Sequence, residues 1–255
     1  MLNNFKIIIP FYNAEEYIER CVLSVLTQKY EGNFHIIITN DCSTDSSEGK
    51  ILKYIEENKE KITYIKNNER KTALENIHNM IMNHCETEDV VVFVDGDDFL
   101  INKNVINYLN DFYNDSANNN PWIVYGQFSF STGGVGFASA YSPEEYQKVR
   151  FSPFRVSHLR TIKAGLYHKI KEQDENFECM KDKNGFFYKI SYDVAIFFVL
   201  MDMCPFDKIK FNKKPLYVYN FENPISDHVL DQKGQTNTHI EISKKKPFKK
   251  IDSYK

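Results

Sequence analysis

The chain has 255 residues, a length that suits one large domain or one domain with an appendage. Of these residues 42% are hydrophobic and 26% are charged, proportions typical of a globular protein. The formal net charge of -3 argues against a dedicated nucleic-acid binder, because neutralising many phosphates requires a basic excess. Five widely spaced cysteines without a Cys-x-x-Cys pair indicate neither a disulfide framework nor a zinc site. We therefore expect a reducing, cytoplasmic location, with no signal peptide and no transmembrane segment.

Strands and helices are expected to alternate in the first hundred residues. Apolar, β-branched runs predict buried strands at residues 5–10, 35–39, 62–65 and 90–94. Helical spacing of apolar residues predicts intervening helices, and Asn13 is expected to cap the first of them. Near-continuous apolar strands between helices are typical of a parallel sheet that is covered on both faces. The sequence thus predicts an α/β fold with a Rossmann-like, mainly parallel sheet flanked by helices.

The pattern is looser after residue 100. A strand is predicted at 122–130 and an apolar helix at 191–203. The glycine-rich segment 131–136 is expected to be a mobile turn, with a functional lid as the alternative. The basic run 244–250 is expected to be solvated or disordered, as most such runs are, and weak contact with an anionic membrane surface or acceptor stays open.

Polar clusters follow three of the predicted strands. Residues 10–13 follow the first, Asp41 follows the second, and Asp95-Gly96-Asp97-Asp98 follows the fourth. Ligands of parallel sheets bind beyond the carboxyl ends of the strands, so we expect these clusters to meet in one crevice. Three neighbouring carboxylates repel one another unless a cation lies between them, and oxygen ligands favour Mg²⁺ or Mn²⁺. The alternative is an ordinary acidic turn.

Together these segments resemble the family-2 glycosyltransferases, which have the GT-A fold. The matching segments are the opening strand and turn at 7–13, the helix at 21–28, the acidic turn at 40–45, the Asp-x-Asp motif at 95–98, the acidic pair at 192–193 and the strand at 215–219. Two departures stand out: the family's Ala-Arg-Asn segment is matched only at Asn68 and Asn76, and Tyr192 replaces one carboxylate of the acidic pair.

The resemblance also implies how the chain is organised. Residues 1–100 would form the nucleotide-sugar-binding half, and residues 101–225 the smaller, acceptor-binding half of the same GT-A domain. Residues 226–255 would form a C-terminal loop and a basic tail. The implied reaction is metal-dependent, inverting transfer of a hexose from a UDP-sugar to a hydroxyl acceptor, which could be a glycan, a lipid-linked sugar or a protein.

The donor site is implied by the same resemblance. The residues expected to bind the nucleotide sugar are Pro10, Phe11, Tyr12, Asn13, Glu15, Asp41, Arg70 and Asp95. Asp41 is expected to accept a hydrogen bond from the uracil N–H, and an aromatic ring of the first turn is expected to stack on the base. Structural alternatives exist: Asp41 could cap the next helix, Glu15 could favour the helix dipole, and Arg70 could be solvated.

The metal ligands are implied to be carboxylates, with Mn²⁺ or Mg²⁺ as the cofactor. Asp97 is expected to bind the cation directly, and Asp95 to contact the ribose or a metal-bound water. His228 in the C-terminal loop is expected to bind the metal or the diphosphate, since imidazole can bind Mn²⁺.

Asp193 is the expected general base, which removes the proton from the acceptor hydroxyl. Its alternative role is that of an ordinary acidic residue at the start of a helix. Asp98 is expected to orient a helix or to touch the acceptor, and His158 and Arg160 to face the acceptor or the diphosphate.

Two other functions remain open. A sugar nucleotidyltransferase also joins a nucleotide-binding sheet to metal-holding carboxylates, although residues 10–13 are not the Gly-rich, basic loop of that class. A non-catalytic module that binds a nucleotide sugar or a glycan is the alternative from another class. The sequence does not identify the sugar, the acceptor or the oligomeric state.

Overall fold

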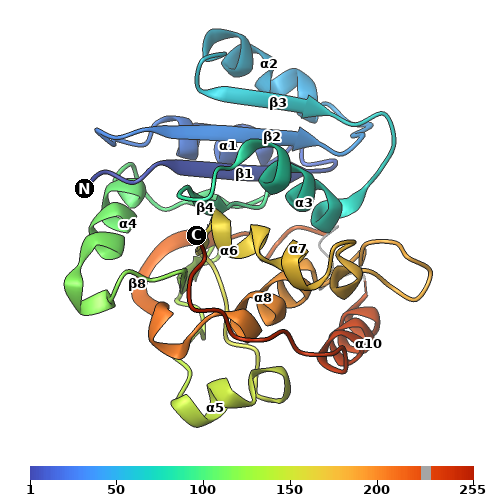
Figure 1. Ribbon diagram of the computed structural model, residues 1–255. Coiled ribbons are helices and arrows are strands. Elements are labelled where there is room, and N and C mark those ends of the chain that lie inside the picture. The colour runs from blue at the N-terminus through green and yellow to red at the C-terminus, as the bar shows by residue number, and fades with distance from the viewer. Residues whose placement is uncertain (225–230) are drawn as a thin grey trace.

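One eight-stranded sheet, in the order β3-β2-β1-β4-β7-β6-β8-β5, organises the computed structural model, which describes residues 1–224 and 231–255 (Figure 1). The strands of its first half are β1 (Phe5–Phe11), β2 (Phe34–Asn40), β3 (Ile62–Lys66) and β4 (Val90–Phe93). All their pairings are parallel, with β1 between β2 and β4. The predicted parallel sheet is therefore confirmed.

Helices cover both faces of this half, as the apolar runs predict. The helices are α1 (Ile18–Leu26), α2 (Ser47–Glu57) and α3 (Thr72–His84). Successive side chains of a strand point to opposite faces: Ile7 and Ile9 of β1 pack with α1 and α2, whereas Ile8 packs with α3. Figure 1 shows α3 in front of the sheet and α1 behind it.

The second half continues the same sheet with mixed strand directions. Its elements are β5 (Phe99–Leu100), α4 (Val105–Asn114), β6 (Ile123–Phe130), α5 (Pro143–Gln147), β7 (Arg160–Lys163), α6 (Ala164–His168), α7 (Ile170–Gln173), α8 (Tyr192–Met203) and β8 (Ile209–Tyr219), with short 3-10 turns at Ser116–Asn118, Val149–Phe151, Glu178–Met180 and Phe206–Lys208. Strand β7 is antiparallel to both β4 and β6, and β8 is parallel to β6. The strand predicted at 122–130 and the apolar helix at 191–203 are confirmed.

Helix α8 is the central helix of this half. Every residue from Val194 to Met201 is buried, so the helix is apolar on all sides and is covered all round. The glycine-rich segment after β6 is a tight turn, with positive φ at Gly133 and Gly134 and a bridge between Ser129 and Val135.

The C-terminal segment contains a helix where a loop was expected. Helix α10 (Gln232–Ser243) follows the undescribed residues, and the segment after it crosses α8 and returns toward α6 (Figure 1). Lys250 donates to the carbonyls of Met201 and Cys204, at 2.9 and 2.5 Å. The last carbonyls of a helix have no intrahelical partners, so Lys250 satisfies backbone acceptors at the C-terminus of α8. Most residues of 244–250 are exposed, as expected, but the contacts of Lys250 with the end of α8 were not predicted.

The predicted helix cap at Asn13 was also wrong. Helix α1 begins at Ile18, and Asn13 has φ = 46° in the turn that precedes the helix. Within the described residues, no helix combines the length and the apolarity that crossing a membrane requires.

Candidate active site

A cavity of about 630 Å³ lies beyond the carboxyl ends of β1 and β4. Segments far apart in sequence line it: the end of β1 and the turn after it, the start of α3, the acidic turn 95–98, the loop before β7, the first turn of α8, residues at and after the end of β8, and one face of α10. Pro10 and Phe11 end β1, and Tyr12 begins the turn that follows it. The structure thus brings together two of the three polar clusters, as the parallel sheet predicts.

The acidic turn packs directly against the end of β1. A Cβ atom on Gly96 would lie 2.5 Å from the Cβ of Phe11, so only glycine fits at this position without a shift. The turn closes through a hydrogen bond from the Asp98 amide to the Asp95 carbonyl, at 3.0 Å. Gly96 therefore sets how closely the carboxylates approach the nucleotide side of the cavity.

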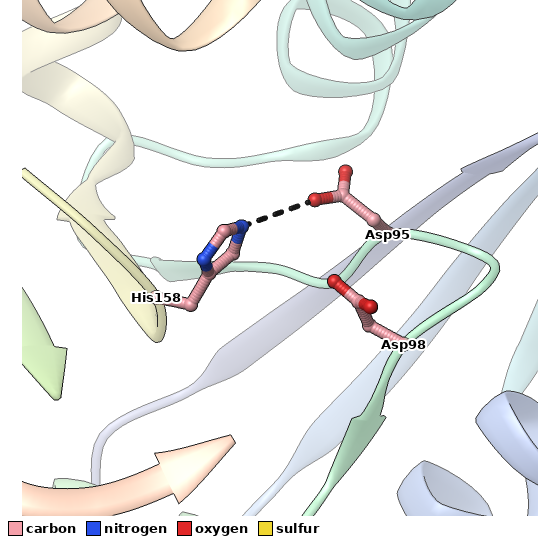
Figure 2. Close-up of side chains that lie close together, drawn as sticks. All are labelled: Asp95, Asp98 and His158. Carbon is pink, nitrogen blue, oxygen red and sulfur yellow. Dashed lines mark ion pairs between the residues drawn. The ribbon is translucent and has the colours of Figure 1, made fainter. Parts of the chain in front are cut away.

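Asp95 is held from three sides. Its Oδ1 accepts a 2.6 Å hydrogen bond from the Tyr192 hydroxyl, and its amide donates to the Tyr217 hydroxyl at 3.0 Å. Its Oδ2 lies 3.5 Å from Nε2 of His158 (Figure 2). Burial would raise the pKa of Asp95, but contacts with His158, Arg160 and Tyr192 outweigh it and hold that pKa below its ordinary value.

The register of the sheet explains the meeting of Asp95 and His158. Strands β4 and β7 are antiparallel, with Phe93 opposite Arg160. Continuing this register by two residues places Asp95 opposite His158. Burial and the charge of Arg160 lower the pKa of His158 despite the opposing effect of Asp95, so the imidazole is neutral at neutral pH.

Asp98 is almost fully buried, with 1% of its surface exposed. Its Oδ1 accepts a 2.7 Å hydrogen bond from the Asn220 amide, whereas its Oδ2 has no hydrogen-bond partner among the described residues. Burial, followed by the charges of Asp97 and Asp95, raises its pKa well above the ordinary value. Burial and the neighbouring carboxylates therefore disfavour the charged form of Asp98, and a cation beside it would favour that form.

Asp97, the expected metal ligand, accepts a 2.6 Å hydrogen bond from the side chain of Asn223 and lines the cavity. The close group of potential ligand atoms in the described chain is a different one: atoms of Asp95, Asp98 and His158 all lie within 4.8 Å of one another. His228, the other expected ligand, lies outside the described residues.

Asp193 lies in the first turn of α8 and lines the same cavity. Its Oδ2 accepts a 3.0 Å hydrogen bond from Arg160, and its Oδ1 accepts one from the Val194 amide. Arg160 is 5% exposed and also donates to the Tyr192 hydroxyl at 3.0 Å. Arg160 thus links Asp193, the candidate base, to Tyr192, whose hydroxyl donates to Asp95.

Two donor-site candidates, Tyr12 and Arg70, lie together at the cavity. The guanidinium carbon of Arg70 is 3.6 Å from the centre of the Tyr12 ring. The Nε of Arg70 is also 3.8 Å from Oδ2 of Asp41. The planar pair forms a stacking surface at the edge of the cavity.

Three other donor-site candidates have structural partners. Asp41 accepts hydrogen bonds from the amides of Lys71 and Thr72, both at 2.8 Å, and so caps α3. Glu15 accepts from the Ser46 amide at 3.0 Å, and Asn13 from the Thr44 amide at 2.8 Å, which ties the turn after β1 to the start of α2. None of these candidates is among the described residues that line the cavity.

Sequence reasoning missed several residues of the site. They are Tyr217, Tyr219, Asn220 and Asn223, at and after the end of β8, and Gln235 and His239 of α10. Tyr217 and Tyr219 lie in the segment 215–219 that resembles the family, but no role in the site was expected of them, and the other four residues carry no motif. One signal could have found those near β8: residues just beyond the carboxyl end of a strand face the crevice. This rule was used for the first four strands and applies equally to β8.

The model of the family described as glycosyl transferase family 2 matches residues 6–169. The chain belongs to this family. GlyA of Streptococcus pneumoniae, named a glycosyltransferase, is 36% identical over 98 residues, which are 38% of this chain and 13% of GlyA. This family-2 chain thus corresponds to a small part of that relative's length.

Solved structures confirm the GT-A fold that the resemblance implied. Staphylococcus aureus TarS 1–349 in complex with UDP-GlcNAc has a TM-score of 0.60 at 16% identity, over 86% of this chain and 59% of that one. The mannosyltransferase PcManGT from Pyrobaculum calidifontis, in complex with GDP-Man and Mn²⁺, has a TM-score of 0.59 at 14% identity, over 88% and 58%.

Proposed function

We propose that this family-2 chain is a metal-dependent, inverting glycosyltransferase that moves a hexose from a UDP-sugar to a hydroxyl acceptor. The observation that carries the proposal is the meeting of the acidic turn 95–98, the stacking pair Tyr12–Arg70 and Asp193 in one cavity. The nucleotide sugars bound in TarS and PcManGT support the donor class, and the name UDP-GlcNAc in the former favours UDP.

The charge of the cavity supports metal dependence. The described residues that line it carry four carboxylates and two guanidinium groups, from Asp95, Asp97, Asp98, Asp193, Arg70 and Arg160. When all are ionised, two negative charges remain uncompensated, and the diphosphate of a nucleotide sugar is itself an anion. The buried Oδ2 of Asp98, without a hydrogen-bond partner, fits a cation at this position. A bound Mn²⁺ or Mg²⁺ would neutralise the diphosphate as it leaves.

The donor is proposed to bind across the first hundred residues. Tyr12 and Arg70 would hold the base by stacking, with Pro10 and Phe11 beneath it. Asp41 would contribute indirectly, because it fixes the start of α3 and pairs with Arg70. Asp97 and Asp95 would face the diphosphate and the ribose.

The acceptor is proposed to bind beside α8, within residues 101–225, and α10 would supply the remaining wall. Asp193 would accept the proton of the acceptor hydroxyl as that oxygen attacks the anomeric carbon. Arg160 would keep the carboxylate of Asp193 turned toward the cavity. A glycan, a lipid-linked sugar or a protein could supply the hydroxyl.

The direct test incubates the protein with a panel of UDP- and GDP-sugars in Mn²⁺, in Mg²⁺ or in excess chelator, and measures nucleotide release. We expect UDP release from at least one UDP-sugar and none with the chelator. Conversion of a UDP-sugar and added inorganic diphosphate to UTP and a sugar 1-phosphate would indicate a nucleotidyltransferase, and binding of a nucleotide sugar without turnover would indicate a non-catalytic module.

The Asp193→Asn variant tests the base. It should bind UDP like the wild type and lose transfer by about 100-fold or more, since a positioned base contributes 10²–10⁴-fold. Undiminished turnover would exclude Asp193 from this role.

A further inference from the structure

We propose that His158 is a metal ligand, which together with Asp95 and Asp98 forms a site for one divalent cation. The inference rests on the proposed function and makes it more specific, because it adds an imidazole nitrogen to the ligands. It also moves the nitrogen ligand from His228, which the family resemblance suggested, to the loop before β7.

The geometry of the three side chains suits one ion. Their ligand atoms lie within 4.8 Å of one another, and Asp95 Oδ2 and His158 Nε2 face each other at 3.5 Å (Figure 2). Metal bonds to oxygen and nitrogen are about 2.0–2.2 Å long, so two ligand atoms of one ion are at most about 4.4 Å apart. Small side-chain adjustments would therefore bring all three atoms onto one cation.

Asp98 supplies an independent observation. Its Oδ2 is buried and has no hydrogen-bond partner among the described residues, although its Oδ1 is satisfied by Asn220. In Figure 2 the carboxylate of Asp98 turns toward His158 and Asp95. A buried polar atom without a partner is costly, and a cation at this position would remove that cost.

His158 is positioned before any cation binds. Its ring stacks between those of Tyr217 and Tyr219, at centroid distances of 4.8 and 5.2 Å and interplanar angles of 11° and 19°. Asp95 is fixed in turn by the Tyr192 hydroxyl at its other oxygen, Oδ1. Groups that orient metal ligands in this way strengthen binding.

The ligand set predicts a preference for Mn²⁺. Mg²⁺ favours an all-oxygen shell, whereas imidazole binds the transition metals more readily. The positive charge of Arg160 opposes a cation, but Arg160 is paired with Asp193 and donates to Tyr192, so Asp95, Asp97 and Asp98 still give the site a net negative charge.

The experiment titrates the full chain with Mn²⁺ alone, using the loss of the free-ion electron paramagnetic resonance signal to obtain the affinity. Pulsed measurements on the bound ion then detect nitrogen coupling, and protein grown on ¹⁵N-histidine identifies the nitrogen as histidine. We expect histidine coupling in the wild type. In His158→Gln the coupling should vanish and Mn²⁺ affinity should fall at least about tenfold, with a smaller preference over Mg²⁺.

Two histidine variants serve as controls. His239→Gln alters another histidine of the same cavity, and His228→Gln alters the ligand suggested by resemblance; both should keep the coupling and the affinity. Coupling that survives in His158→Gln, or that is lost in His228→Gln, would overturn the proposal.

The proposal can be tested even if His158→Gln does not fold. A wild-type spectrum without histidine coupling would overturn it, as would an Asp98→Asn variant that binds Mn²⁺ as tightly as the wild type. Mn²⁺-dependent nucleotide release without histidine coupling would refute the role of His158 as a metal ligand and would leave the proposed function supported. Histidine-bound Mn²⁺ in a protein that releases no nucleotide would refute the function instead.

Discussion

The hydroxyl of Tyr192 donates a 2.6 Å hydrogen bond to Asp95, across 97 residues of sequence. Burial and then the charge of Asp95 raise the pKa of Tyr192 well above its ordinary value, so the phenol stays protonated and remains a donor. Arg160 donates to the same hydroxyl and to Asp193. One chain of hydrogen bonds therefore joins the acidic turn to the candidate base. Its central member is Tyr192, at the position where the family resemblance implies a carboxylate.

We predict that Arg160→Lys lowers kcat by about 10- to 100-fold while the KM for the donor changes little. Lysine keeps the charge but has one nitrogen in place of the two that donate to Tyr192 and Asp193, so it does not reproduce both contacts, and small displacements of a catalytic group cost up to about 100-fold. Steady-state kinetics measure both constants. Arg150→Lys is the matched control, because Arg150 is also 5% exposed and pairs with Asp202 away from the cavity. It should lower stability and spare kcat; equal kinetic losses in both variants would contradict the prediction.

The stacking pair is expected to act on donor binding. Tyr12→Ala should weaken UDP binding by about tenfold, because stacking of a base on an aromatic ring contributes about 1–3 kcal/mol. Isothermal titration calorimetry with UDP measures the change. Lys71→Ala is the control, because Lys71 pairs with Glu75 and lies outside the described cavity lining. The hydrogen bond from its backbone amide to Asp41 does not involve the Lys71 side chain and survives the substitution. Unchanged UDP affinity in Tyr12→Ala would exclude the pair from the base site.

Gly96→Ala should destabilise the protein by about 1–3 kcal/mol, the usual cost of overpacking. The added Cβ would lie 2.5 Å from the Cβ of Phe11 and 3.1 Å from the Pro10 carbonyl oxygen, both at the buried end of β1. Denaturant unfolding measures the loss. Gly49→Ala, in α2, meets nothing within 4 Å and should be neutral or stabilising by up to about 1 kcal/mol. A stable Gly96→Ala variant would show that the turn can move away from Phe11.

Acid should destabilise the protein partly through His78. Burial, and secondarily Lys181, lowers the pKa of His78 to about 4, and its ring packs 4.4 Å from that of Phe177. Below about pH 6.5, His78 therefore binds a proton in the unfolded chain but stays neutral in the folded chain. The free energy of unfolding consequently falls as the pH drops from 6.5 to 4.

Unfolding free energies measured across this pH range should fall less steeply in His78→Gln. His84→Gln provides the control, because His84 is exposed at the end of the same helix. Identical slopes in the wild type and His78→Gln would exclude this histidine as a source of acid sensitivity.

Much of the fold could be predicted from local patterns. The apolar runs around Ile8, Ile37 and Val92 allowed β1, β2 and β4 to be placed, because residues of a sheet buried on both faces must be apolar at successive positions. The cap at Asn13 was predicted wrongly, and the contacts of Lys250 were missed, for one reason. Capping and solvation depend on neighbours that local sequence does not reveal, such as the carbonyls at the end of α8 that Lys250 satisfies.

The sequence by itself determined that acidic and aromatic residues follow buried strands, and so that a phosphate-directed site lies at one edge of a sheet. Only the tertiary structure decided which side chains meet there. His158 faces Asp95 because β7 runs antiparallel to β4, and Asn220 reaches Asp98 because β8 ends beside the acidic turn. Periodicity records whether a residue is buried, whereas its partner depends on strand order and direction, which are set by packing over the whole chain.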